Sequence, residues 1–208
     1  MERKAHWEAI YKTREPTAVS WYQPHLRQSL ALIQQAAASR DVRIIDVGGG
    51  ASTLVDDLLS QGFTHLTVLD ISGEALSISK ARLGKQASLV EWLEADVTQA
   101  TLPAAHYNIW HDRAAFHFLT EDESRRKYLE VLRLSLRPGG HAILAAFGPN
   151  GPSHCSGLAV RRSHPEALPV ELGEEFTLCE SVREEHRTPT GATQEFFYGH
   201  FIKQARLE

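Results

Sequence analysis

The sequence predicts an α/β domain in which a mostly parallel sheet is covered by helices on both faces. Short apolar runs alternate with helical patterns along residues 43–147, in the manner of repeated strand–helix units. The chain of 208 residues has the length of one compact domain, and its 42% hydrophobic and 23% charged residues are typical of a globular protein. We therefore predict a single domain over residues 1–208.

Four strands are predicted in the first half of the chain. The β-branched run at residues 43–47 suits a buried strand, and the helix after Ser52 has an apolar face made of Leu54, Val55, Leu58 and Leu59. The other three strands span residues 65–69, which end at Asp70, residues 88–93 and residues 107–110. A helix at residues 73–83 separates the second strand from the third.

The second half opens with the clearest helix, at residues 121–136, whose apolar face comprises Tyr128, Leu129, Leu132 and Leu136. Arg-Pro-Gly-Gly at residues 137–140 ends this helix, and a fifth strand is predicted at residues 141–147. The loop at residues 148–153 is expected to lie over a site. A short helix at residues 165–172 precedes two strands, at residues 176–182 and 195–203, which flank a turn around residues 189–191. Their short connection predicts that these strands are antiparallel.

Residues 1–40 differ in character from the repeated units, because Trp7, Tyr11, Trp21 and Tyr22 punctuate helical stretches there. We expect this segment to pack over the sheet edge as a helical lid. Aromatic faces attract a positively charged ligand through cation–π interactions. Packing in the core is an equally good explanation of the same residues.

Composition argues against several classes of partner. Apolar runs fall short of the ~20 residues that cross a bilayer, and none follows the charged start, so we expect no membrane association, no secretory signal and a cytoplasmic location. The net charge of −4, with scattered Lys and Arg, argues against a nucleic-acid partner. The two cysteines, Cys155 and Cys179, cannot build a disulfide framework. The histidines lack metal-binding spacings, so no metal site is predicted.

The strongest local signal is a buried strand that runs through Asp46 into Gly48, Gly49 and Gly50 and then into a helix. Glycines allow a sharp turn and let a ligand lie against the main chain, although a turn that only needs positive φ angles would use them too. Asp70 ends the second strand, where a carboxylate can accept hydrogen bonds from both hydroxyls of a ribose. The alternative role of Asp70, a helix N-cap, is already available to Ser72.

The position of a third acid, Asp96, helps to decide between a dinucleotide and a smaller nucleoside cofactor. Asp96 follows the third strand, where a carboxylate can accept from an adenine amino group. A dinucleotide site uses the same turn and ribose acid, but its fingerprint needs a third glycine where this chain has Thr53. Asp46 and Asp96 also have no place in the dinucleotide pattern. We therefore predict a small cofactor without phosphates.

The ordered motifs Asp46-Val47-Gly48-Gly49-Gly50, Asp70, Asp96 and Leu136-Arg137-Pro138-Gly139-Gly140 resemble those of class I S-adenosylmethionine-dependent methyltransferases over nearly the whole chain. The resemblance implies a Rossmann-like seven-stranded mixed sheet, mostly parallel, with an antiparallel C-terminal strand and helices on both faces. It implies S-adenosyl-L-methionine as cofactor and S-adenosyl-L-homocysteine as product. Ser52 replaces a common third motif glycine.

The same resemblance assigns the cofactor-binding residues. Gly48 and Gly50 would lie against the methionine part, Asp70 would hold the ribose, and Asp96 and Val97 would frame the adenine. The remaining candidates for this site are Asp46, Gly49, Ile71, Trp21 and Tyr22.

The segment at residues 107–118 follows the fourth strand, where this family positions its substrate beside the sulfonium. Asp112-Arg113-Ala114 also resembles a region of the thiopurine and tellurite methyltransferase group, which act on small, soft nucleophiles. If the acceptor must lose a proton, the catalytic candidates are His111, His117 and Asp112, with Arg113 beside them. Alternatively, His117 is simply packed at a helix start, and Asp112 and Arg113 form an ion pair that fixes the loop.

Three functions fit these patterns. The first is methyl transfer to a small-molecule acceptor such as a thiol, which Cys155 in the predicted active-site loop could touch unless it is only a small buried residue. The second is N-methylation of protein lysine. The third is a non-catalytic module that binds S-adenosylmethionine and regulates a partner. The Asn/Asp-Pro-Pro-aromatic sequence of many amino-methyltransferases is missing here, and the polar cluster at His111 favours an enzyme over a pure binder.

Overall fold

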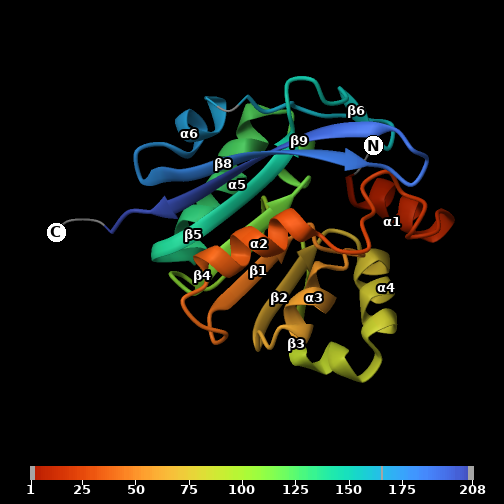
Figure 1. Cartoon of the computed structure of the whole chain (residues 1–208), viewed down its shortest axis with the longest axis horizontal. Coiled ribbons are helices and arrows are strands. Elements are labelled where there is room, and N and C mark those ends of the chain that lie inside the picture. Colours follow the sequence, from red (N-terminus) through yellow and green to blue (C-terminus); the bar gives the residue numbers. More distant parts are fainter. Residues whose placement is uncertain (1–2, 165, 206–208) are drawn as a thin grey trace.

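The computed structural model describes residues 3–164 and 166–205, and its central feature is a seven-stranded sheet (Figure 1). The strand order is β3-β2-β1-β4-β5-β9-β8. The five parallel strands are β1 (Arg43–Val47), β2 (His65–Asp70), β3 (Val90–Glu94), β4 (Tyr107–Arg113) and β5 (Leu136–Phe147). β9 (Thr193–Lys203) runs antiparallel to β5 and to β8 (Phe176–Arg187). The predicted mixed sheet with an antiparallel C-terminal strand is confirmed.

Helices cover both faces of the sheet. One face carries α2 (Arg27–Ala36), α3 (Leu54–Ser60) and α4 (Gly73–Leu83), and the other carries α5 (Asp122–Ser135) and α6 (Ala167–Leu172). The shorter elements are the 3-10 helices η1 (Gly84–Leu89) and η2 (Phe116–Phe118) and the hairpin of β6 (His154–Cys155) and β7 (Leu158–Ala159). α1 (Arg3–Thr13) lies beside α4 at the end of the sheet (Figure 1). Among the described helices, none is long and apolar enough to cross a bilayer.

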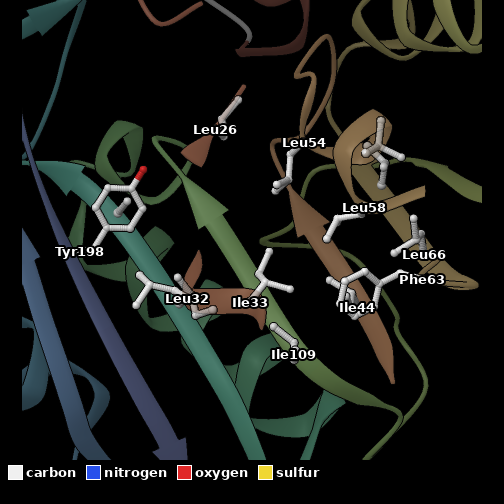
Figure 2. Packing of buried hydrophobic residues seen from close by; sticks show 14 of the residues in the cluster. Leu26, Leu32, Ile33, Ile44, Leu54, Leu58, Phe63, Leu66, Ile109 and Tyr198 are labelled. Atoms are coloured by element: carbon white, nitrogen blue, oxygen red, sulfur yellow. The ribbon is translucent and has the colours of Figure 1, made fainter. Parts of the chain in front are cut away.

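Alternation along the strands divides the core into two layers. Ile44 of β1 and Ile109 of β4 pack toward Ile33 of α2, as Figure 2 shows. The next residues, Ile45 and Trp110, belong to the layer on the α5 side. Successive side chains of a strand point to opposite faces, so both layers are filled from the same strands. The same alternation decides toward which face of the sheet each polar side chain at the carboxyl ends of β1 and β4 points.

Several predicted boundaries differ from the structure. β4 continues past the predicted residue 110 to Arg113, because hydrogen bonds to β1 and β5 on both sides carry it onward. Residues 137–140 belong to β5 and form no separate turn; Gly139 takes φ +73° where the register between β4 and β5 shifts. β8 and β9 are longer than predicted, and β6 and β7 lie in a segment for which no strand was expected. Residues 1–2 of the predicted lid and residue 165 of the predicted helix lie outside the described residues.

Candidate active site

A cavity of about 840 Å³, counting the part open to solvent, lies at the carboxyl ends of the parallel strands. Its walls come from the ends of β1, β2 and β4 and from the segment after β3, and Trp7 and Tyr11 of α1 also line it. In open α/β sheets this crevice is where ligands bind.

The glycine turn after β1 is packed so closely that side chains are excluded. Gly48 has φ +71°, and a Cβ there would lie 2.6 Å from the Cβ of Ala115. At Gly50 a Cβ would lie 2.5 Å from Oδ2 of Asp70, and at Gly49 it would collide with the carboxylate of Asp46. The three glycines therefore bring the main chain against the two acids, and Gly48 leaves its backbone exposed to the cavity.

Asp70 is a buried carboxylate at the end of β2 that lines the cavity. Oδ1 accepts a hydrogen bond from the backbone N–H of Ser72 at 2.9 Å. The N-cap of α4 is Ser72, whose hydroxyl accepts from the N–H of Ala75, so Asp70 does not fill that role. Burial raises the pKa of Asp70 to about 7, and the charge of Asp46 adds to this effect.

Asp96 lies at the rim of the cavity with one carboxylate oxygen already engaged. Oδ1 accepts from the backbone N–H of Thr98 at 2.9 Å and from its hydroxyl at 2.7 Å. Oδ2 lies 3.2 Å from a guanidinium nitrogen of Arg3, the first described residue of α1. Asp96, which the sequence predicts to contact the adenine, is thus also in contact with the N-terminal helix α1.

Polar contacts hold α1 beside the cavity. The basic–acidic pairs are Arg3–Asp96, Lys4–Glu94 at 2.6 Å and Lys12–Glu74 at 3.4 Å. In addition, Glu8 accepts a hydrogen bond from the N–H of Gly73 at 2.8 Å. Each exposed ion pair is weak, worth about 0–1 kcal/mol, so the helix is held by several contacts that can open separately.

Aromatic rings from the N-terminal segment meet over the cavity. The ring of Trp7 lies 4.8 Å from that of Phe118 and 5.8 Å from that of Trp21, and Tyr11 lies 6.3 Å from both tryptophans. All four side chains line the cavity. These residues are partly buried and pack on each other as well as facing the cavity, so both sequence interpretations describe part of the arrangement.

The extension of β4 to Arg113 separates the polar cluster that the sequence predicted. His111 and Arg113 point toward the α2 face, like Ile109, whereas Asp112 points toward α5, like Trp110. Side chains that are consecutive on a strand cannot converge on one reacting atom. Only His111 and Arg113 of this triplet line a hollow at the site.

His111 forms a buried pair with Asp46. The two residues are direct partners in the parallel register of β1 and β4, and Nδ1 of His111 lies 2.7 Å from Oδ1 of Asp46. Both line a second, smaller hollow on the far side of Gly48, together with Tyr22 and Gly49. Nε2 of His111 is buried and has no hydrogen-bond partner among the described residues.

Asp112 holds the chain after β4 and does not face the cavity. Its carboxylate accepts from the hydroxyl of Tyr128 at 2.7 Å and from the N–H groups of Ala115 and Phe116. Burial raises the pKa of Asp112 to about 6, against these hydrogen bonds, which lower it. The predicted Asp112–Arg113 ion pair was wrong, because alternation places the two side chains on opposite faces of the sheet.

Arg113 is fixed between the two hollows. Its Nε donates to the hydroxyl of Tyr198 at 3.0 Å, one terminal nitrogen lies 3.4 Å from Glu184, and the other donates to the carbonyl of Trp21. The guanidinium also lies 4.0 Å from the ring centre of Phe196. With its donors engaged in this way, Arg113 forms a rigid wall that also holds the loop carrying Trp21.

His117 lies in η2 and is completely buried, at 0% exposure. Its ring lines the larger cavity and packs on Phe118 and Phe147. Nδ1 accepts from the N–H of Phe147 at 3.4 Å, and Nε2 has no partner among the described residues. Burial lowers the pKa of His117 to about 3, with Arg113 and Arg125 adding to the shift, so the ring is neutral near pH 7.

A comparison with protein families matches residues 44–140 to a family described as "Methyltransferase domain". These residues include Gly48, Asp70, Asp96 and Arg113, all of which line the cavity. The matched residues are just under half of the chain, and the match supports the class I S-adenosylmethionine-dependent methyltransferase predicted from the sequence. The order of strands in this chain, with the antiparallel β9 between β5 and β8, agrees with the sheet that the resemblance implies.

Curated relatives of this chain include methyltransferases with different acceptors. The mouse eEF1A lysine and N-terminal methyltransferase is 26% identical over 134 residues, which are 64% of this chain and 19% of the relative. The C-methyltransferase UbiE of ubiquinone and menaquinone biosynthesis from Methylobacterium nodulans is 26% identical over 124 residues, 58% of this chain and 48% of the relative. The chain thus spans about a fifth of the first relative and half of the second.

Solved structures share the fold over nearly the whole chain. A protein studied for the conversion of a disulfide bond into a thioacetal group during echinomycin biosynthesis has a TM-score of 0.78 and 17% identity, covering 97% of this chain and 92% of that one. The 1,6-didemethyltoxoflavin-N1-methyltransferase of Burkholderia thailandensis, solved with its substrate and S-adenosylhomocysteine, has a TM-score of 0.71 and 19% identity, covering 97% and 87%. At these sequence identities, the similarity to the solved structures shows a common fold and nothing about the substrate.

The methyltransferase fold gathers most of the predicted site residues. Those lining the larger cavity are Trp21, Gly48, Asp70, Ile71, Asp96, Val97, Arg113 and His117, and those in the smaller hollow include Asp46, Gly49, Tyr22 and His111. Gly50 packs against Asp70, and Asp112 faces α5. Sequence reasoning missed Phe147 and Phe196 as cavity residues and the partners Tyr198 and Glu184 of Arg113, because isolated residues of β5, β8 and β9 carry no local motif.

Proposed function

We propose that this chain transfers the methyl group of S-adenosylmethionine to a small-molecule acceptor bound in the larger cavity. The observation that supports this proposal is that two kinds of residues line one continuous cavity. The glycine turn and the acids Asp70 and Asp96 border one side of the cavity, and the aromatic residues Phe147 and Phe196 border the other. A nucleoside cofactor and an apolar acceptor would meet in such a space.

The residues present fit the adenosine half of the cofactor. Asp70 is buried with only part of its hydrogen-bonding capacity used, which is the condition under which a ribose would supply the missing donors. Asp96 has Oδ2 directed to the rim, where Arg3 is its partner. Val97 and Ile71 supply apolar lining on the same side of the cavity.

The smaller hollow fits the amino-acid end of the cofactor. Four residues line both hollows, namely Tyr11, Trp21, Gly48 and Arg113, so the two spaces adjoin at the glycine turn. The Asp46 carboxylate fixes the His111 ring, and the buried, unpartnered Nε2 of His111 would then accept a hydrogen bond from the ammonium group. We therefore assign the Asp46–His111 pair to binding of the cofactor and not to proton transfer from the acceptor.

When bound, S-adenosylmethionine supplies an electrophilic methyl group on a positively charged sulfur. The chain's own residues would orient the acceptor and exclude water from it, and this positioning can supply a large part of the acceleration. Tyr11 and Trp21, at the junction of the hollows, would present aromatic faces to the positive charge. His117 is poorly suited as a general base, because its lowered pKa makes it a weak proton acceptor near pH 7.

Methylation of protein lysine is the second candidate, favoured by similarity to the eEF1A methyltransferases. A peptide would have to enter beside α1, which is held by the weak ion pairs described above. Radiolabelled S-adenosylmethionine with purified eEF1A, set beside a panel of thiols and heterocycles, distinguishes the two candidates. Label transferred to eEF1A and to none of the small molecules would favour the lysine reaction.

The first test is calorimetric titration with S-adenosylmethionine, S-adenosylhomocysteine and NAD. We expect both adenosyl compounds to bind, NAD not to bind, and the isosteric variant Asp70→Asn to lose most of the affinity. His65→Phe, at the exposed start of β2 away from the cavity, is the control and should bind normally. Absence of binding to the wild-type chain would refute the proposed function.

A further inference from the structure

The His117 ring carries a fixed and unused hydrogen-bond donor. Because Nδ1 accepts from the backbone N–H of Phe147, the proton of the neutral ring resides on Nε2. Nε2 is buried and has no partner among the described residues, although the ring forms part of the cavity wall. A buried donor left without a partner costs about 1–3 kcal/mol, so a ligand that accepts this bond gains affinity.

The cavity wall around His117 is mostly aromatic or aliphatic, with Arg113 and Cys155 as its polar residues. The residues that share this side of the cavity are Arg113, Ala114, Ala115, Phe118, Leu119, Phe147, Cys155 and Phe196. Among these described residues there is no carboxylate; the acids that line the cavity, Asp70 and Asp96, belong to the cofactor side. Arg113 is engaged with Glu184, and burial raises the pKa of Cys155, so its thiol stays neutral near pH 7.

These features select the charge and shape of the acceptor. An ammonium group would find no carboxylate among these residues with which to pair. Flat rings, in contrast, match the faces of Phe147 and Phe196, and stacked or edge-on aromatic pairs contribute beyond the area they bury. A hydrogen-bond acceptor on such a ring would satisfy His117.

We propose that the acceptor is a flat, uncharged heterocycle that receives a hydrogen bond from Nε2 of His117 through a ring carbonyl or thiocarbonyl group. This inference rests on the proposed function and names its substrate class. In the transfer, a lone pair of the heterocycle bonds to the methyl carbon while the sulfur–carbon bond breaks and its electron pair stays on sulfur. Since the wall supplies no suitable base, the methylated product keeps the N–H or S–H proton of the acceptor and loses it to solvent after it leaves the cavity. His117 is a positioning residue for the ring.

The experiment compares two probes of similar shape on the protein saturated with S-adenosylhomocysteine. Quinazolin-4-one carries a ring carbonyl, and naphthalene has no hydrogen-bonding atom; dissociation constants are measured by ligand-observed NMR titration. His117→Phe keeps the ring that packs on Phe147 and should weaken quinazolin-4-one binding about tenfold, with naphthalene unaffected. His117→Gln, which keeps a donor, should restore part of the affinity, and the control His65→Phe should match the wild type.

The outcomes separate this inference from the function on which it rests. Failure of the wild-type chain to bind S-adenosylhomocysteine would refute the proposed function. Normal cofactor binding with equal losses of both probes in His117→Phe would show only a packing role for this ring and would overturn the inference. Tighter binding of the peptide Gly-Lys-Gly than of quinazolin-4-one would also overturn it.

Discussion

Binding of S-adenosylhomocysteine should depend on pH in the neutral range because of Asp70. Burial raises the pKa of Asp70 from 3.8 to about 7, and the charges of Asp46 and Glu8 add to the shift. Ribose hydroxyls donate hydrogen bonds, so they need the ionised carboxylate as acceptor. Protonation of Asp70 removes that acceptor, and affinity should therefore fall as the pH is lowered through 7.

The size of the effect follows from the ionised fraction of Asp70. With a pKa of about 7, roughly ten elevenths of the carboxylate is ionised at pH 8 and roughly one eleventh at pH 6. If only the ionised form binds, the dissociation constant rises about tenfold over this interval, which corresponds to about 1.4 kcal/mol.

Calorimetric titrations at pH 6, 7 and 8 measure this dependence, and Asp70→Asn serves as the matched control. The variant keeps the shape of the side chain but cannot ionise, so its weaker binding should be nearly constant with pH. An equally steep dependence in Asp70→Asn, or a flat profile in the wild type, would refute the assignment of this titration to Asp70.

Other residues of the site give separate predictions. His111→Phe should weaken S-adenosylhomocysteine about tenfold but leave 5′-methylthioadenosine, which lacks the amino-acid end, unchanged in calorimetry; equal losses for the two ligands would contradict the assignment of the smaller hollow. Trp21→Ala should weaken S-adenosylmethionine several-fold by removing an aromatic face, with the circular dichroism spectrum preserved, and unchanged affinity would remove its role in the lid. Asp112→Asn should lower the free energy of unfolding in urea by about 1–3 kcal/mol, because an amide cannot accept from all of its present donors, while cofactor affinity is retained. Undiminished stability would argue against the structural role of Asp112.

The fold was predictable because its signals are local. The β-branched run of β1, the apolar face of α5 and the glycine turn each lie within a few consecutive residues, and their order along the chain specifies the sheet. Asp70 was also predictable, since it lies at the end of a recognisable strand. Its neighbour Ser72 was correctly expected to be available as the helix cap.

The predicted catalytic cluster at residues 111–113 shows the limit of reasoning from neighbouring residues. The end of β4 was predicted at residue 110, so His111, Asp112 and Arg113 were treated as one polar loop. The actual strand continues because β1 and β5 offer hydrogen-bonding partners on both sides, and neither partner is adjacent in sequence. A shift of a strand end by three residues decides which face each of these side chains takes.

Neighbouring residues alone specify the class of fold, the glycine turn and the positions of Asp70 and Asp96 after their strands, because strand period, helix period and glycine conformations are local properties. Contacts between distant segments pair His111 with Asp46, turn Asp112 toward Tyr128, and bury His117 against Phe147 with one nitrogen unpartnered among the described residues. These relationships arise from strand register and from packing between distant segments, where no repeating pattern links the partners along the chain.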